Sequence, residues 1–126
     1  MSIKFQGAAA VLGQSAAASY TGNPILIDMI NAISFDFDWT GTFSGSFIIE
    51  VTNALQSSAS QFPAVVDPTA IWKPILTMVV TNGSATDSTP TWWAEATTSA
   101  RFIRFRFNNT SGTGLFNCKF HGKSFG

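Results

Sequence analysis

Strict alternation of apolar and polar residues is the strongest constraint in this chain of 126 residues. In residues 33–40, Ile-Ser-Phe-Asp-Phe-Asp-Trp-Thr, every odd position is apolar and every even position is polar. Successive side chains of a β-strand point to opposite faces of a sheet, so a period of two gives one buried face and one solvated face. The segment therefore predicts a strand that covers one side of a hydrophobic core.

The same alternation resumes after a short break. Residues 41–45, Gly-Thr-Phe-Ser-Gly, have the composition of a turn, and residues 46–52 again place Phe47, Ile49 and Val51 on one face. Two alternating runs on either side of a glycine-containing turn are typical of a β-hairpin. We therefore expect residues 33–52 to form a hairpin.

Further strand-like runs follow along the chain. They cover residues 75–80, 92–96, 101–107 and 115–120, and the segments 81–90 and 108–114 between them are rich in Gly, Ser, Thr and Asn. Short strands joined by such turns, without helical segments in between, are typical of all-β sandwiches and barrels. We predict a single all-β domain over residues 1–126, built as an antiparallel β-sandwich or a jelly-roll-like barrel.

Two segments lack this alternation. Residues 7–24 are rich in alanine, but three glycines and Pro24 interrupt them and no amphipathic stripe forms, which favours an extended arm or edge segment over a helix. We therefore expect residues 1–24 to form such an N-terminal arm. Residues 54–71 form a long connection that contains two prolines, and long loops in compact domains are often functional or form interfaces.

The chain carries few charges. Charged residues make up 11% of the sequence and apolar residues 45%, whereas about 25% of a typical soluble domain is charged. The interface cores of permanent complexes are depleted in charge, so this composition favours a protein that covers its flanks with copies of itself or with a larger assembly. Residues 1–100 have a net charge of −5 and residues 101–126 a net charge of +5, which favours attraction within the fold or between subunits.

Three arginines alternate with apolar residues in the segment 101–107, Arg-Phe-Ile-Arg-Phe-Arg-Phe. A strand over these residues places most of the aromatic rings on one face and Arg104 and Arg106 on the other. A platform for single-stranded nucleic acid needs rings and basic groups on the same face, and a net charge of zero removes the main electrostatic attraction to phosphates. We expect no nucleic-acid binding, and we expect these arginines to pair with acids such as Asp36 and Asp38 or with a neighbouring subunit.

No pattern in the sequence predicts catalysis. Asp36 and Asp38 share a strand face, and paired carboxylates can act in acid/base or glycosidase chemistry, but a solvated strand face is the preferred interpretation. Cys118 and His121 are each the single residue of their type, so neither a disulfide within the chain nor a cysteine-based metal site is expected. We expect no enzyme activity, no metal and no cofactor. No apolar run reaches the roughly 18 residues of a membrane-spanning helix, so no membrane partner is expected either.

Adjacent tryptophans form a second candidate site. On a strand, Trp92 and Trp93 point to opposite faces, so at least one of them is exposed or lies at an interface. A place in the core or at a subunit contact is the preferred interpretation. A carbohydrate-stacking platform that also uses Trp72 and Tyr20 is the alternative.

Three segments resemble a known family. They are Ser2–Gly7, residues 32–53 (AISFDFDWTGTFSGSFIIEVTN) and residues 101–126 (RFIRFRFNNTSGTGLFNCKFHGKSFG). Together they resemble small bacteriophage virion structural proteins, in which an aromatic strand leads through a Thr-Gly-Thr turn into a second strand and a hairpin closes the chain. Residues 54–100 match only loosely. The resemblance implies a β-sandwich component of the phage particle and supplies no catalytic residues.

Composition and resemblance lead to the same hypothesis. The chain is expected to be a virion structural protein, a capsid decoration or cement subunit that forms a homo-oligomer, with a trimer favoured, and that binds the phage major capsid protein. The alternative is a receptor- or carbohydrate-binding module of a spike or tail fibre, with a host glycan as its partner. The residues expected at interfaces are Phe5, Val11, Leu12, Trp92, Trp93, Arg104 and Arg106.

Overall fold

The computed structural model describes residues 3–27, 30, 32–53, 69–84, 89–98 and 100–125, and it describes only the backbone of residues 3–9, 124 and 125. All regular structure in this part of the chain is β-strand. The strands are β1 (Ile3–Ser15), β2 (Tyr20–Thr21), β3 (Ile25–Leu26), β4 (Ala32–Gly41), β5 (Ser44–Thr52), β6 (Lys73–Val80), β7 (Thr91–Thr97), β8 (Phe102–Ser111) and β9 (Gly114–Phe125).

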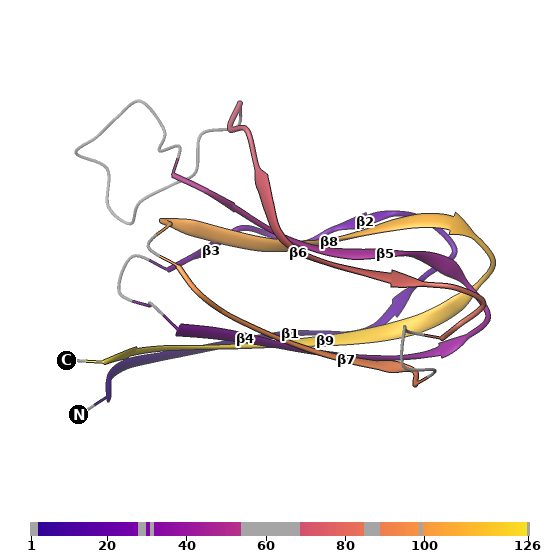
Figure 1. Ribbon diagram of the computed structural model, residues 1–126, viewed down its shortest axis with the longest axis horizontal. Helices are drawn as coiled ribbons and strands as arrows, with labels where there is room; N and C mark the ends of the chain where they lie inside the picture. Colours follow the sequence, from indigo (N-terminus) through magenta and orange to yellow (C-terminus); the bar gives the residue numbers. More distant parts are fainter. Residues whose placement is uncertain are drawn as a thin grey trace.

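The strands form two antiparallel sheets that pack face to face (Figure 1). Sheet A has the order β1-β9-β4-β7, and sheet B has the order β2-β8-β5-β6, with β3 also paired to β8. If β2 and β3 are taken as one interrupted strand, this is the strand order of a jelly roll. The predicted all-β sandwich is confirmed, and the two sheets do not close into a barrel.

The predicted hairpin over residues 33–52 is wrong. β4 pairs with β7 and β9 in sheet A, whereas β5 pairs with β6 and β8 in sheet B. The apolar faces of the two strands meet across the core, where the ring centroids of Phe37 and Phe47 lie 4.8 Å apart. Alternation shows which face of a strand is buried, but it does not show which strand lies beside it.

The closing hairpin that the family resemblance implied is also wrong, for the same reason. β8 belongs to sheet B, where it pairs with β5, β2 and β3, and β9 belongs to sheet A, where it pairs with β1 and β4. The turn residues between β8 and β9 therefore carry the chain from one sheet to the other.

The connections that follow β1, β4 and β8 cross between the sheets at one end of the sandwich, on the right of Figure 1. They bond to one another through the backbone. The Thr42 amide donates to the carbonyl of Thr113 (3.2 Å), and the Gly83 amide donates to the carbonyl of Phe43 (2.8 Å). The Ala16 amide donates to the carbonyl of Gly114 (2.8 Å), which ties the connection between β1 and β2 to the same end.

The core is mainly aromatic. As the alternation predicts, Ile33, Phe35, Phe37 and Trp39 of β4 are all buried. They meet rings from sheet B, including Phe47 and Phe105, and the Phe43 ring packs against Phe107 at the crossing end between the sheets. Tilted and edge-to-face ring pairs of this kind add to the stabilisation from buried area.

The N-terminal residues are part of the sandwich. Residues 3–15 form β1, which pairs with β9 and is one of the two edge strands of sheet A. A bulge interrupts the pairing between Val11 and Gln14, and it contains Gly13 with a φ of 64°. Most of the long connection expected over residues 54–71 lies outside the described residues.

Candidate functional site

The two adjacent tryptophans lie on opposite faces of β7, as predicted. The Trp92 ring is half-buried and stacks on Phe37, with ring centroids 5.1 Å apart. Trp93 is 60% exposed on the outer face of sheet A, and its indole Nε1 donates a hydrogen bond of 2.5 Å to Glu95 Oε1. Trp92 is therefore a core residue in the monomer, and Trp93 is the one of the pair that can meet a partner.

Trp93 borders a shallow hollow on the outer face of sheet A. The hollow has a volume of about 300 Å³, and its lining includes Ser34, Glu95, His121 and Lys123. An exposed indole beside acidic, basic and hydroxyl groups can stack on a flat ring and hydrogen-bond to its substituents. This surface is the part of the chain where a carbohydrate contact has a structural basis.

Asp36 and Asp38 of β4 lie on the same outer face of sheet A, opposite Lys119 and Asn117 of β9. The Asn117 amide donates to Asp38 Oδ1 (2.7 Å), and Asn117 Oδ1 accepts a hydrogen bond from the Gly13 amide (2.8 Å). This chain of bonds links β1, β9 and β4. Asp38 is thus held in place by a neutral amide, an arrangement that fits a structural role.

Arg104 and Arg106 lie on the outer face of sheet B, and their acidic partner is Glu50 of β5. The distance from Arg104 Nε to Glu50 Oε1 is 2.9 Å, and that from Arg106 Nη2 to Glu50 Oε2 is 3.2 Å. The expected pairing with Asp36 and Asp38 is wrong, because these acids lie on sheet A. Opposite charges pair readily across neighbouring strands, but only the sheet order shows that β5 and β8 are neighbours.

The Glu50 side chain is buried although it lies on an outer face. The Trp72 ring covers this cluster, with the Arg104 guanidinium carbon 4.2 Å from the ring centroid. Arg106 Nη1 also donates to Asn108 Oδ1 at 2.6 Å. The arginines therefore compensate a buried carboxylate, and a cation–π contact holds one of them.

We expect the substitution Arg104→Met to destabilise the protein by about 1–3 kcal/mol, because Glu50 then loses one of its two cationic partners while it stays buried. Urea denaturation followed by tryptophan fluorescence measures this loss. The exposed Lys119 provides the control, since Lys119→Met removes the same charge and should change stability by less than about 0.5 kcal/mol. Equal effects of the two substitutions would contradict the role of the cluster.

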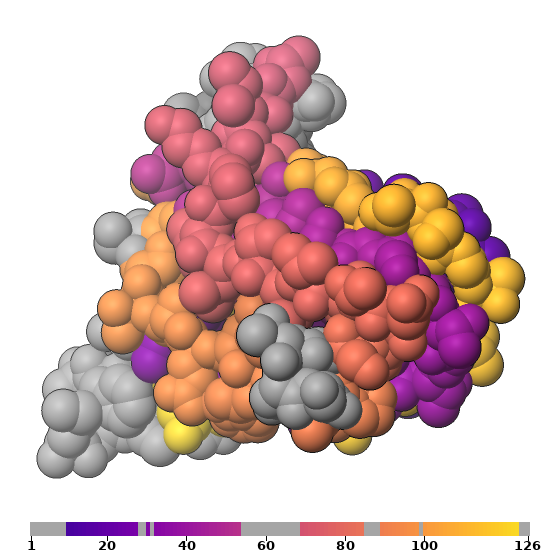
Figure 2. Space-filling view, turned by 45° about the vertical axis from the view of Figure 1, so that its right-hand side comes forward, coloured from indigo at the N-terminus to yellow at the C-terminus, as the bar shows by residue number. Residues whose placement is uncertain are grey.

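The edge strand β6 exposes apolar side chains in a stretch of the strand that contains no charged residue. From Pro74 to Val80 the strand contains no charged residue. Ile75 and Val79 are exposed, the latter by 59%. Figure 2 shows β6, in salmon, along the surface of the molecule. Among the described strands only β5 pairs with it. Sequence reasoning identified this segment as a strand covered on both faces, whereas one of its faces is open.

The remaining predicted interface residues lie on β1. Leu12 is 67% exposed at the bulge, and Val11 is half-buried against the core. The Phe5 backbone pairs with Ser124, but its side chain lies outside the described residues. Leu12, Trp93 and the two arginines thus lie on separate surfaces, whereas Val11 and Trp92 pack against the core. The interface role of the seven predicted residues stays a prediction.

The side chain of Cys118 is buried. Burial, with a smaller contribution from the Asp36 carboxylate, raises the pKa of the Cys118 thiol far above its usual value, so the thiolate is disfavoured. Within the described ranges, no three His, Cys, Asp or Glu side chains are grouped to hold a metal ion. The described residues also include no helix long and apolar enough to cross a membrane.

Comparisons with known proteins find solved structures of similar fold. No family model matches the chain, and no curated protein matches it in sequence. The SPBc2 prophage-derived protein YomS is similar over 98% of this chain and 99% of its own, with 10% sequence identity and a TM-score of 0.49. A structure of Bacillus endospore appendages, described as disulfide-linked pili, is similar over 96% of this chain and 88% of its own, with 14% identity and a TM-score of 0.43. At these low identities and TM-scores we draw nothing about function from either likeness.

Proposed function

We propose that this protein is a structural subunit of a bacteriophage particle, a capsid decoration or cement protein that acts through protein–protein contacts and not as an enzyme. The observation that carries the proposal is the edge strand β6, which carries no charge from Pro74 to Val80 and has Ile75 and Val79 exposed on its outer face. An edge strand offers backbone donors and acceptors to another chain, and natural monomers usually protect such edges with charges. The exposed Leu12 and Trp93 supply further apolar contact area on sheet A.

The resemblance of residues 32–53 and 101–126 to small phage virion proteins supports the same proposal. In this role each subunit contributes weak contacts that add up because many copies bind one shell. Closed symmetry is usual for such oligomers, and a trimer that binds the major capsid protein is the assembly we favour. Backbone hydrogen bonds between the crossing connections hold one end of the subunit rigid. The surfaces that make these contacts can therefore keep the same geometry in every copy.

A second lysine in β6, in addition to Lys73, tests this function. We expect Val79→Lys to weaken self-association and binding to undecorated shells at least about tenfold, because a charge on an edge strand disfavours strand pairing. Thr40→Lys adds the same charge at an exposed position of β4, an inner strand of sheet A, and is the matched control that should bind like the original protein. Analytical ultracentrifugation and co-sedimentation with shells measure the two effects. Identical binding by both variants, or a mass-spectrometric stoichiometry of only a few copies per particle, would contradict the proposal.

One observation favours a second function, glycan binding by a spike or tail-fibre module. Trp93 is exposed beside the hollow that Glu95 and His121 line. In that case a glycan array would show saturable binding that Trp93→Ala abolishes. Trp92 takes no direct part in this alternative, because its ring packs on Phe37.

A further inference from the structure

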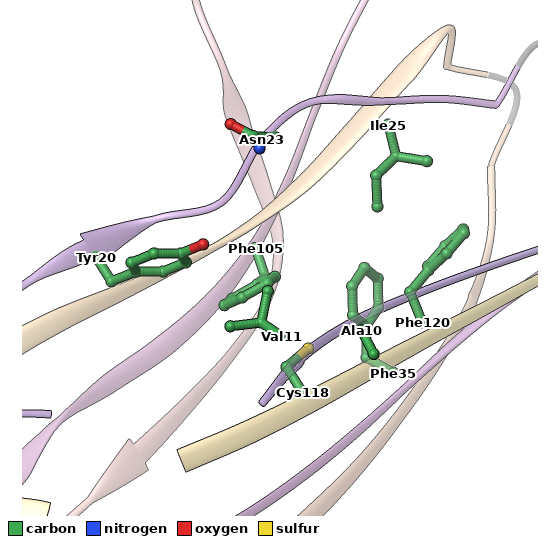
Figure 3. Close-up of a pocket in the computed structure, with 9 residues that line it drawn as sticks. All are labelled: Ala10, Val11, Tyr20, Asn23, Ile25, Phe35, Phe105, Cys118 and Phe120. Atoms are coloured by element: carbon green, nitrogen blue, oxygen red, sulfur yellow. The ribbon is translucent and has the colours of Figure 1, made fainter. Parts of the chain in front are cut away.

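A pocket opens between the two sheets at the side where β1 of sheet A faces β2 and β3 of sheet B. Its volume is about 140 Å³. Phe35, Phe105, Cys118 and Phe120 are buried residues of its lining. Figure 3 shows the lining residues arranged around this space.

The pocket exists because neither edge fills it. β1 carries small side chains here, with Ala10 and Val11 in the lining. On the opposite edge the strand is interrupted between β2 and β3, and Asn23 in this interruption is exposed. The strand is therefore broken at the mouth of the pocket, and the polar side chain of Asn23 borders the mouth there.

The lining selects an uncharged occupant. It contains no charged side chain, and four of its members are aromatic: Tyr20, Phe35, Phe105 and Phe120. An ion would lose its hydration here without a compensating charge. The raised pKa of Cys118 keeps the thiol neutral as well. A cavity of about 150 Å³ with apolar walls stays dry and holds a benzene molecule, so the volume fits one aromatic ring.

Two polar groups in the lining can determine the orientation of a ligand in the pocket. The Tyr20 hydroxyl and the Asn23 amide both belong to the lining, and in Figure 3 the hydroxyl is directed toward the other lining residues. Neither side chain makes a hydrogen bond to another residue in the described part of the chain. A ligand hydroxyl near the mouth can therefore bond to them while its ring lies against the phenylalanines.

We propose that this pocket binds a neutral, single-ring aromatic molecule that carries one hydroxyl group, with phenol as its simplest member. The ring packs among Phe35, Phe105 and Phe120, and the hydroxyl bonds to Tyr20 or Asn23. This site lies between the sheets, apart from the exposed surfaces of β6 and β7, so the proposal does not depend on a role in the virion.

Titration of the full chain with phenol, followed by amide chemical shifts, tests the site. We expect saturable binding with a dissociation constant on the order of 0.1–10 mM, as suits a ligand of about seven heavy atoms. The shifts should centre on β2, β3 and the middle of β9. Benzene should bind as well, since it fills the same apolar space.

Variants that fill the pocket give the sharpest comparison. Ile25→Trp and Val11→Phe should each weaken phenol binding at least about tenfold by occupying the space. Leu26→Trp is the matched control for Ile25→Trp, because Leu26 is the next residue of β3, is exposed and does not line the pocket. It should leave binding unchanged. Two filling variants keep the test decisive if one of them fails to fold.

Tyr20→Phe tests the hydroxyl contact. It should weaken phenol binding about three- to tenfold and leave benzene binding unchanged, because only phenol loses a hydrogen bond. Absence of saturable binding up to about 50 mM phenol would overturn the proposal. Unchanged binding by both filling variants would also overturn it, as would a crystal structure in which a side chain of a neighbouring copy fills the pocket and excludes phenol.

Discussion

Replacing Gly41 with alanine is expected to destabilise the protein by about 2–6 kcal/mol, enough to unfold a marginally stable domain. Gly41 ends β4 with a φ of 104°, a conformation that side chains with a Cβ rarely adopt. A Cβ at this position would also lie 2.5 Å from the carbonyl oxygen of Thr113, so the backbone of the neighbouring connection would have to move. Because the crossing connections bond to one another, such a shift disturbs the whole end of the sandwich.

Gly13 supplies the matched control for this substitution. It also has a positive φ, 64°, but a Cβ there would meet nothing within 4 Å. Gly13→Ala should therefore cost only the backbone strain, about 1–2 kcal/mol. Urea denaturation of both variants separates strain from steric conflict. If the two substitutions had equal effects, the close approach of the connections would have no energetic importance.

The second large effect is expected for Phe47→Ala, which should destabilise the protein by about 3–5 kcal/mol. Phe47 is fully buried in β5, and its ring contacts rings from both sheets. The centroid distances are 4.8 Å to Phe37, 5.0 Å to Phe107 and 5.2 Å to Phe116. Truncation leaves a cavity between the sheets that these rigid rings cannot close.

Equilibrium denaturation in urea, followed by the fluorescence of the buried Trp39, measures this loss. Phe47→Leu retains most of the volume and should cost about 1–2 kcal/mol. Ile75→Ala, on the exposed face of β6, should change stability by no more than about 0.5 kcal/mol. A loss for Phe47→Ala no larger than that for Ile75→Ala would show that the sheets do not pack as described.

The candidate interaction sites were partly predictable. Alternation placed Arg104 and Arg106 on the outer side of a strand and separated Trp92 from Trp93, because both conclusions depend only on the period of two. Their partners were not predictable. Glu50 lies more than fifty residues from the arginines, and only the pairing of β5 with β8 brings the three side chains together.

The sequence also did not predict the pocket between the sheets or the exposed face of the edge strand β6. The run 75–80 reads as a strand buried on both faces because its residues are almost all apolar, yet β6 is at the edge of sheet B and one face is exposed. The pocket depends on the break between β2 and β3 and on its distance from β1. Gly22 and Pro24 mark the break in the sequence, but the distance from the break to β1 leaves no local pattern.

Where apolar and polar residues alternate, the sequence by itself determined the strands and their buried faces, since side-chain alternation follows from the local geometry of an extended backbone. The tertiary structure alone decided that the glycine-rich turns at 41–44 and 111–114 cross between sheets. The same turn chemistry serves a hairpin or a crossing, and the choice depends on whether two apolar faces gain more by facing each other across a core than by lying side by side. In this chain the large aromatic side chains of β4 and β5 bury each other across the core, and that packing sets the fold.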